Sequence, residues 1–228
     1  MTREAGAPDP RRGVLGRATG AVYWFLLVEA CFLLAAAPAF VGMLLLERDA
    51  SNLPLYALCL VPVGPAFSAA MSTIASRSDD LTVWPRFWKA YARDLIDVLW
   101  VWVPALALAT VLGVTVAYGA AVGVDGFFVV AAIAFLVILG LWSANALVIA
   151  SFFSFRARDV ARLALYYLAA RPLVTLGAFS YLLIAAAIVT FTSDWVLALL
   201  GVFFAAFAVV NAKGMTTDIR SRFVTPEA

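Results

Sequence analysis

The sequence predicts an all-α membrane protein, a polytopic bundle of six transmembrane helices with two cytoplasmic interfacial amphipathic helices and both termini inside the cell. Of its 228 residues, 65% are apolar, whereas a soluble domain is usually about 45–50% apolar, so lipid must solvate much of the surface. Six apolar segments approach the ~20 residues that a helix needs to cross the ~30 Å hydrocarbon core. The charged residues, only 13% of the chain, cluster between these segments.

The six apolar segments are predicted to be helices. Unpaired backbone groups are not tolerated in lipid, and the alternation of barrel strands is missing. The flanking segments are expected to be cytoplasmic tails around one transmembrane bundle, and the first tail is expected to be disordered because it is rich in proline, glycine and arginine. The predicted spans are 21–46, 53–74, 95–118, 127–151, 173–191 and 195–211, within a bundle of 21–211 and between tails of 1–20 and 212–228.

The positions of lysine and arginine orient these spans. If the N-terminus is cytoplasmic, every one of the 16 basic residues except Arg48 lies on the cytoplasmic side. Cytoplasmic loops of membrane proteins carry such an excess of basic residues. The remaining loops, 47–52, 119–126 and 192–194, are short and are predicted to lie outside.

The two cytoplasmic loops, 76–94 and 156–171, each predict an amphipathic helix at the membrane surface. Their aromatic side chains are expected at headgroup level, and their cations are expected to face water or anionic lipid. The repeated order of span, interfacial helix and span leaves an internal parallel duplication open. The candidate membrane-interface or partner-docking residues are Trp84, Arg86, Phe87, Trp88, Lys89, Tyr91, Arg93, Arg156, Arg158 and Arg162.

A helix kink is predicted in the second span at Pro62, Gly64 and Pro65. Proline removes a backbone hydrogen bond and clashes with the preceding helical turn. Such a break either exposes backbone dipoles to a substrate or serves close helix packing through small residues.

Four polar residues in the predicted cytoplasmic half form a candidate polar cluster or solute site. Glu29 lies nine residues into the first span, where a charge costs at least ~2.5 kcal/mol and must be protonated, paired or in a wet cavity. Asp97 follows Arg93 by one helical turn, which makes Arg93 a candidate partner. A structural lock between spans and a solute site are both compatible with this set, which is Glu29, Asp97, Asn145 and Asn211.

The sequence contains no catalytic, cofactor-binding or metal-binding constellation. Histidine is absent, which removes the commonest catalytic base and metal ligand. No P-loop, GxSxG, HExxH, CxxC or dinucleotide fingerprint occurs. The net charge of +2 gives no argument for a nucleic-acid partner. We therefore expect neither enzymatic activity nor a cofactor.

Two stretches carry a resemblance to a known family: residues 61–70, VPVGPAFSAA, and residues 84–91, WPRFWKAY. Here the chain resembles the YesL-like family of bacterial integral membrane proteins, the domain of unknown function numbered 624. The resemblance covers about residues 15–222 and implies a multi-pass location in the bacterial cytoplasmic membrane. It also implies an accessory role in carbohydrate uptake, because such genes often lie beside sugar importers of the ATP-binding-cassette type. No catalytic residues are established for the family.

The leading functional hypothesis is a membrane protein without enzymatic activity that assists carbohydrate import and docks importer subunits through its spans or its two amphipathic helices. One alternative is a small-solute transporter with its site at Glu29 and the kinked second span. Another is a membrane enzyme that acts on a lipid-linked substrate. The lipid bilayer is a partner in every case, and the substrate and oligomeric state stay open.

Overall fold

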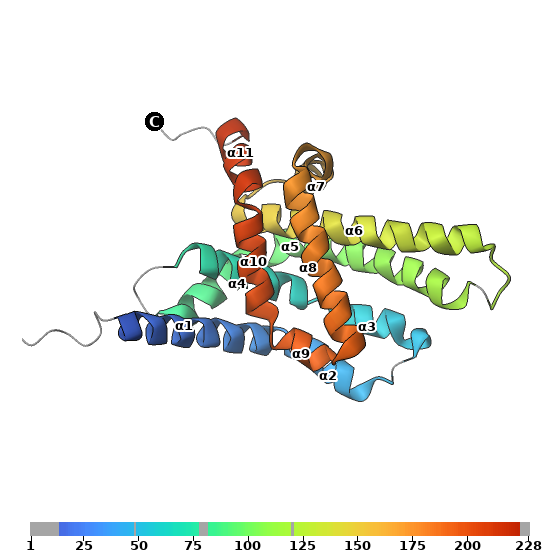
Figure 1. Ribbon diagram of the computed structural model, residues 1–228, viewed down its shortest axis with the longest axis horizontal. Helices are drawn as coiled ribbons and strands as arrows, with labels where there is room; N and C mark the ends of the chain where they lie inside the picture. Colours follow the sequence, from blue (N-terminus) through green and yellow to red (C-terminus); the bar gives the residue numbers. More distant parts are fainter. Residues whose placement is uncertain (1–13, 48, 78–81, 120, 224–228) are drawn as a thin grey trace, which may run out of the picture.

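The computed structural model describes residues 14–47, 49–77, 82–119 and 121–223, and these residues contain helices and no strands (Figure 1). The predicted all-helical class is therefore confirmed. The elements are α1 (Val14–Ala35), α2 (Ala37–Leu45), the 3-10 helix η2 (Ala50–Asn52), α3 (Leu53–Cys59), α4 (Val63–Ala75), α5 (Val83–Tyr118), α6 (Gly126–Phe152), α7 (Ala157–Ala170), α8 (Pro172–Phe191), α9 (Asp194–Ala198), α10 (Gly201–Asn211) and α11 (Lys213–Phe223).

Three helices, α5, α6 and α8, are each long and apolar enough to cross a membrane alone. Three bent helix pairs raise the number of candidate spans in the described residues to as many as six. Large apolar side chains are exposed along these helices, including Leu108, Phe135 and Leu183. Lipid is the solvent that suits such a surface, so the protein is a membrane protein.

The first predicted span is not one straight helix. It is broken at Ala36, where α1 and α2 meet at a bend of 59°. Pro38 lies in the first turn of α2, and its ring and missing N–H disfavour a continuous helix. The segment predicted as the first span, 21–46, is therefore a bent pair of helices instead of one straight helix.

The second predicted span is divided into α3 and α4 by a 45° bend. Pro62 immediately precedes α4, in the stretch where Pro62, Gly64 and Pro65 predicted a kink. The indole N–H of Trp102 donates a hydrogen bond of 3.0 Å to the Leu60 carbonyl at this break. A Cβ at Gly64 would lie 2.5 Å from Cδ1 of Trp102, so glycine is what lets the ring approach the broken helix.

Helices extend into both predicted tails, 1–20 and 212–228. Residues 14–20 form the start of α1, whereas the rest of the tail predicted to be disordered, 1–13, lies outside the described residues. At the other end, α11 begins at Lys213, and its Met215 and Ile219 are fully buried. The predicted sixth span, 195–211, is divided into α9 and α10, and the bent pair that qualifies as a span consists of α10 and α11.

The two predicted interfacial helices differ in form. The second is α7, a separate helix, but the first is continuous with the third span in the 36-residue α5. At 1.5 Å per residue α5 is about 54 Å long, longer than the ~30 Å hydrocarbon core. Phe87 of α5 and Tyr167 of α7 are fully buried against other helices. These two rings therefore pack inside the protein, and the depth of α5 and α7 in the membrane stays a prediction.

Helix α4 lies at the centre of the molecule and contacts α1, α5, α6 and α10 (Figure 1). Its Ala66, Ala69 and Ala70 are fully buried, and such small residues allow close approach between helices in lipid. In the view of Figure 1, α8 and α10 cross α1, α5 and α6 steeply. The C-terminal end of α4, the first half of α5 and the last turn of α6 meet where the candidate site is found.

Candidate functional site

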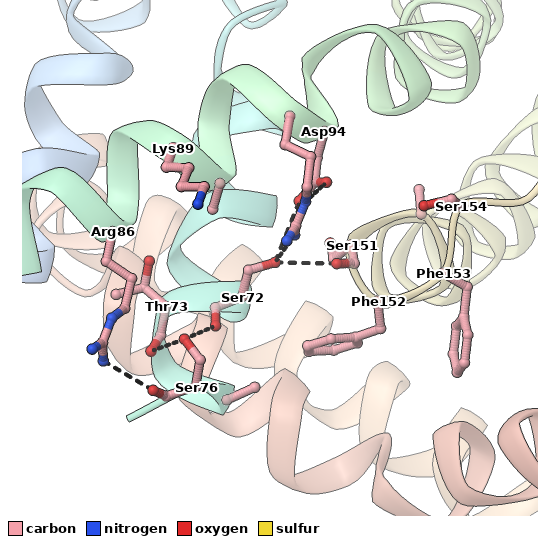
Figure 2. Close-up of a pocket in the computed structure, with 14 residues that line it drawn as sticks. Ser72, Thr73, Ser76, Arg86, Lys89, Asp94, Ser151, Phe152, Phe153 and Ser154 are labelled. Atoms are coloured by element: carbon pink, nitrogen blue, oxygen red, sulfur yellow. Dashed lines mark hydrogen bonds and ion pairs between the residues drawn. The ribbon is translucent and has the colours of Figure 1, made fainter. Parts of the chain in front are cut away.

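A polar cavity of about 650 Å³ lies between the end of α4, the first half of α5 and the end of α6. We call it the cationic pocket (Figure 2). Its lining is more polar than that of the apolar cavity between α1, α4, α8 and α10. Its polar lining includes Ser72, Arg86, Lys89, Arg93, Asp94 and Ser151.

An ion pair between consecutive residues forms one wall of the cationic pocket. Asp94 lies on the face of α5 that also carries the buried Phe87, Ala90 and Val98, and only 7% of it is exposed. Nε and Nη2 of the exposed Arg93 side chain donate to its two carboxylate oxygens at 2.6 and 2.8 Å. A carboxylate buried among apolar helices requires such a partner, so Arg93 compensates the charge that the helix carries into the core.

A chain of serine hydroxyls joins this ion pair to the other two helices. The Ser72 hydroxyl lies 3.1 Å from the carbonyl of Ser151 and 3.4 Å from Oδ2 of Asp94. The Ser151 hydroxyl in turn is 2.8 Å from the Ser68 hydroxyl and 2.6 Å from the Leu147 carbonyl. Since α4, α5 and α6 all contribute, the network fixes the three walls relative to each other.

Two further cations reach the cationic pocket from α5. Arg86 donates through Nη1 to the Ser76 carbonyl at 2.9 Å, a favourable position for a cation because α4 ends at Ala75. Figure 2 shows Lys89 extending from α5 between Arg86 and Ser72. Within the part of the chain that the structure describes, the Lys89 ammonium has no hydrogen-bond or ion-pair partner.

This arrangement is suited to hold an anion. Among the described residues, the lining of the pocket contains one carboxylate, that of Asp94, and Arg93 already neutralises it. Asp94 is a poor general base for the same reason, because its lone pairs are occupied by the guanidinium. Among the residues that the structure describes, no group of three histidine, cysteine or acidic side chains is placed to hold a metal ion.

Glu29 and Asn211, two members of the predicted polar cluster, lie at opposite ends of α10. Oε2 of Glu29 accepts a hydrogen bond of 2.9 Å from the Val202 N–H in the first turn of α10, where the helix dipole favours a carboxylate. Nδ2 of Asn211 donates to the Val174 carbonyl of α8 at 2.8 Å. The nine residues between Val202 and Asn211 correspond to about 14 Å along a helix, so the two side chains do not share a site.

The other two members are also separate. Asp97 is exposed, and Arg93 pairs with Asp94 instead of Asp97. The predicted partner was therefore wrong, because Asp97 lies away from the buried face on which Asp94 lies. Asn145 is buried, and its Nδ2 has no partner in the described residues. Neither residue lines the cationic pocket.

Sequence reasoning missed Asp94, Ser151 and the polar contacts of Ser72. Asp94 could have been identified from its position on the apolar face of the helix. The apolar positions 83, 87, 90, 98 and 101 repeat at the spacing of one helical face, and position 94 is the charged residue on that face. A charge inside an apolar stripe is a better indicator of a buried site than a charge flanked by other polar residues.

A second ionic group joins α7 and the start of α8 to α11. Asp218 accepts from the Tyr167 hydroxyl at 2.8 Å and from Arg171 at 2.9 Å, and Arg222 lies 3.2 Å away. The hydrogen bond from Tyr167, followed by that from Arg171, lowers the pKa of Asp218 below its usual value. Burial and the hydrogen bond to Asp218 raise the pKa of Tyr167 to about 12. Asp218 therefore holds α11 against α7 as an anion.

The predicted interface residues fall into three groups. Phe87 is buried, and Trp88 and Tyr91 are half-buried and pack against the core. Arg86, Lys89 and Arg93 line the cationic pocket. The remaining members are exposed and lie outside the pocket: Trp84, Arg156, Arg158 and Arg162.

A second cavity, of about 450 Å³, lies between α1, α2, α4, α8 and α10. Its lining is apolar and aromatic and includes Phe32, Phe67, Trp102 and Phe204. A hydrophilic solute there would lose its bonds to water and find few polar partners. The two cavities share no lining residue.

Neither a protein-family model, nor a curated protein, nor a solved structure matches this chain significantly. The cationic pocket is therefore interpreted from its own geometry. The resemblance of residues 61–70 and 84–91 to the YesL-like family stays a prediction.

Proposed function

We propose that this protein spans the bacterial cytoplasmic membrane six times with both ends in the cytoplasm, and that it assists carbohydrate uptake without catalysing a reaction. In this role it accompanies an importer of the ATP-binding-cassette type. The observation that carries the proposal is the resemblance in residues 61–70 and 84–91. These two stretches belong to α4 and α5, which pack extensively on each other, and the second borders the cationic pocket.

The docking surface that we propose is the exposed side of α7. Val160, Ala164 and Tyr167 bury the opposite side of this helix, so α7 is held on the bundle. Its exposed side combines the cation Arg162 with the apolar Leu165 and Tyr166. Arginine and tyrosine are enriched at protein interfaces, where they contribute much of the binding energy.

The partner is tested by co-purification with carbohydrate importer subunits after extraction in a mild detergent. We expect these subunits to elute with the wild-type protein and to be lost with the double variant Arg162→Glu/Tyr166→Ala. The matched control is Arg220→Glu, which reverses an exposed charge on α11 and should leave recovery unchanged. Recovery of the protein alone, under conditions that keep importers intact, would contradict the proposed role.

The orientation is tested by labelling single cysteines in a background with Cys31→Ala and Cys59→Ala. An impermeant maleimide added to intact cells should label Asp125→Cys, which precedes α6, and should not label Arg158→Cys on α7. Both should react after the membrane is permeabilised. Labelling of Arg158→Cys in intact cells would place α7 outside and overturn the topology.

A solute carrier with its site at Glu29 is the competing function. The bond from the Val202 N–H to Glu29 and the apolar lining of the neighbouring cavity favour a structural lock over a solute site. Measurement of sugar flux into proteoliposomes distinguishes the solute carrier from the structural lock. A sugar flux that requires this protein and falls with Glu29→Gln would favour the carrier.

A further inference from the structure

We propose that the cationic pocket binds a phosphate group, carried by a phospholipid headgroup or by a soluble phosphate ester. This ligand site does not depend on the proposed role in carbohydrate uptake. It rests on the charges that converge on the pocket, on the way one of them is held in place, and on the size and surroundings of the cavity.

The charge of the pocket favours an anionic ligand. Arg86, Lys89 and Arg93 all come from one side of α5, at spacings of three and four residues, so they extend toward the same cavity. Lys89 has no anionic partner among the described residues, and a bound anion would reduce the repulsion between its ammonium and the neighbouring cations. Lysine and arginine together are the side chains that commonly bind phosphate groups.

The Arg93–Asp94 pair holds one of these cations in advance. Asp94 is buried and accepts hydrogen bonds from Nε and Nη2 of Arg93, which fixes the plane of the guanidinium at the pocket wall. A donor that is already oriented loses less conformational entropy when a ligand binds. The position of Asp94 is thereby explained: it orients Arg93 and adds little negative charge at the mouth of the pocket.

Lys89 supplies the charge that is still available. Its ammonium offers three N–H donors, and no partner for it exists among the described residues. Lysine is a common ligand of phosphate, acting as a point charge beside the more directional guanidinium groups. We therefore assign Lys89 the direct contact with the phosphate.

The size and position of the cavity indicate that the phosphate belongs to a larger molecule. A volume of about 650 Å³ is in the range of small-molecule sites, which is roughly 300–1,000 Å³. Phe152 and Phe153 border it (Figure 2) and offer an apolar surface to an organic group. The pocket lies at the ends of candidate spans, where basic pockets between helices bind lipid headgroups.

The test uses the full-length protein purified in dodecyl maltoside, which contains no phosphate. One arm adds phosphatidylglycerol, with diacylglycerol as the lipid that lacks the phosphate. The other arm adds glycerol 3-phosphate, with glycerol and acetate as controls at equal ionic strength. Native mass spectrometry detects bound lipid. In both arms the Kd is obtained from the shift in the melting temperature of the protein with the concentration of the added compound.

We expect one phosphate compound to bind and its uncharged counterpart not to bind. Lys89→Gln should raise the Kd about tenfold, since a hydrogen bond to a charged group contributes about 1.5 kcal/mol, and Lys89→Arg should retain binding. The matched control is Lys213→Gln, which removes the other lysine of the chain, an exposed one on α11. All three substitutions are at exposed positions and should leave the melting temperature of the free protein unchanged.

The two arms distinguish the sources of the phosphate. Binding of phosphatidylglycerol without glycerol 3-phosphate identifies a lipid site, and the reverse identifies a soluble ester. The proposal is overturned if neither compound binds more tightly than its phosphate-free counterpart. It is also overturned if Lys213→Gln weakens binding as much as Lys89→Gln, because the attraction would then come from diffuse surface charge.

Discussion

Asp94 and Glu29 are two carboxylates on apolar helices, and the protein accommodates them in different ways. Asp94 is bonded at both oxygens by the guanidinium of Arg93 and forms part of a polar cavity. Glu29 accepts from a backbone N–H at the start of α10, and its Oε1 is buried without a partner in the described residues. The first carboxylate orients a ligand-binding cation, whereas the second joins two helices.

The difference shows that a buried charge is not by itself evidence of a functional site. A charge in an apolar helix must be neutralised or solvated, and a helix N-terminus stabilises a carboxylate through its N–H groups and its partial positive charge. Asp94 differs from Glu29 because a cavity lies beside it. Two further cations, Arg86 and Lys89, line the same cavity. Each of the following substitutions tests a part of this contrast.

The largest effect is expected from removing the partner of Asp94. Arg93→Gln leaves a buried carboxylate without its cation and should lower the free energy of unfolding by about 2 kcal/mol, somewhat less than for a fully buried pair because Arg93 is exposed to water. The double variant Arg93→Gln/Asp94→Asn should recover most of this loss. Unfolding in mixed micelles with increasing dodecyl sulfate measures the free energy of unfolding of the single and the double variant. Arg220→Gln, at an exposed position, serves as the control.

A smaller effect is expected at Glu29. Glu29→Ala removes the acceptor for the α10 N-terminus and should cost about 1 kcal/mol. Glu29→Gln keeps an acceptor oxygen and should cost less. The same unfolding assay separates these outcomes. If Glu29→Gln is as damaging as Glu29→Ala, then the negative charge matters and the structural explanation by capping is insufficient.

The smallest effect is expected at Asp218, a third carboxylate, which lies beyond the sixth span predicted from the sequence, 195–211. Its pKa is lowered in the folded protein by the bonds from Tyr167 and Arg171. The stability that it contributes is therefore present above the ordinary pKa of about 4 and is lost as the pH falls through the lower, folded-state value. The difference in melting temperature between wild type and Asp218→Asn should be largest near neutral pH and should vanish in acid. A difference that persists unchanged in acid would show that the contact does not depend on the charge.

Much of the helical architecture was predictable because its signals are local. Apolar length identified the segments that became the candidate spans, and the pattern of α7 placed Val160, Ala164 and Tyr167 on one face, which the structure buries. These features depend on residues a few positions apart, so periodicity is sufficient to detect them. The continuity of α5 was also encoded locally, since neither proline nor glycine separates its amphipathic first half from its apolar second half.

The composition and order of residues by themselves determined that this chain is helical, that it requires lipid and that its cations gather between apolar segments. The tertiary structure alone decided that Asp94 pairs with Arg93, that Glu29 binds the start of α10, and that α5 continues through Pro104 while proline-containing breaks occur at Ala36 and Pro62. Local propensity depends on neighbours along the chain. A buried polar group, in contrast, depends on whichever distant donor the packing brings within hydrogen-bond distance, and no pattern in one segment specifies that donor.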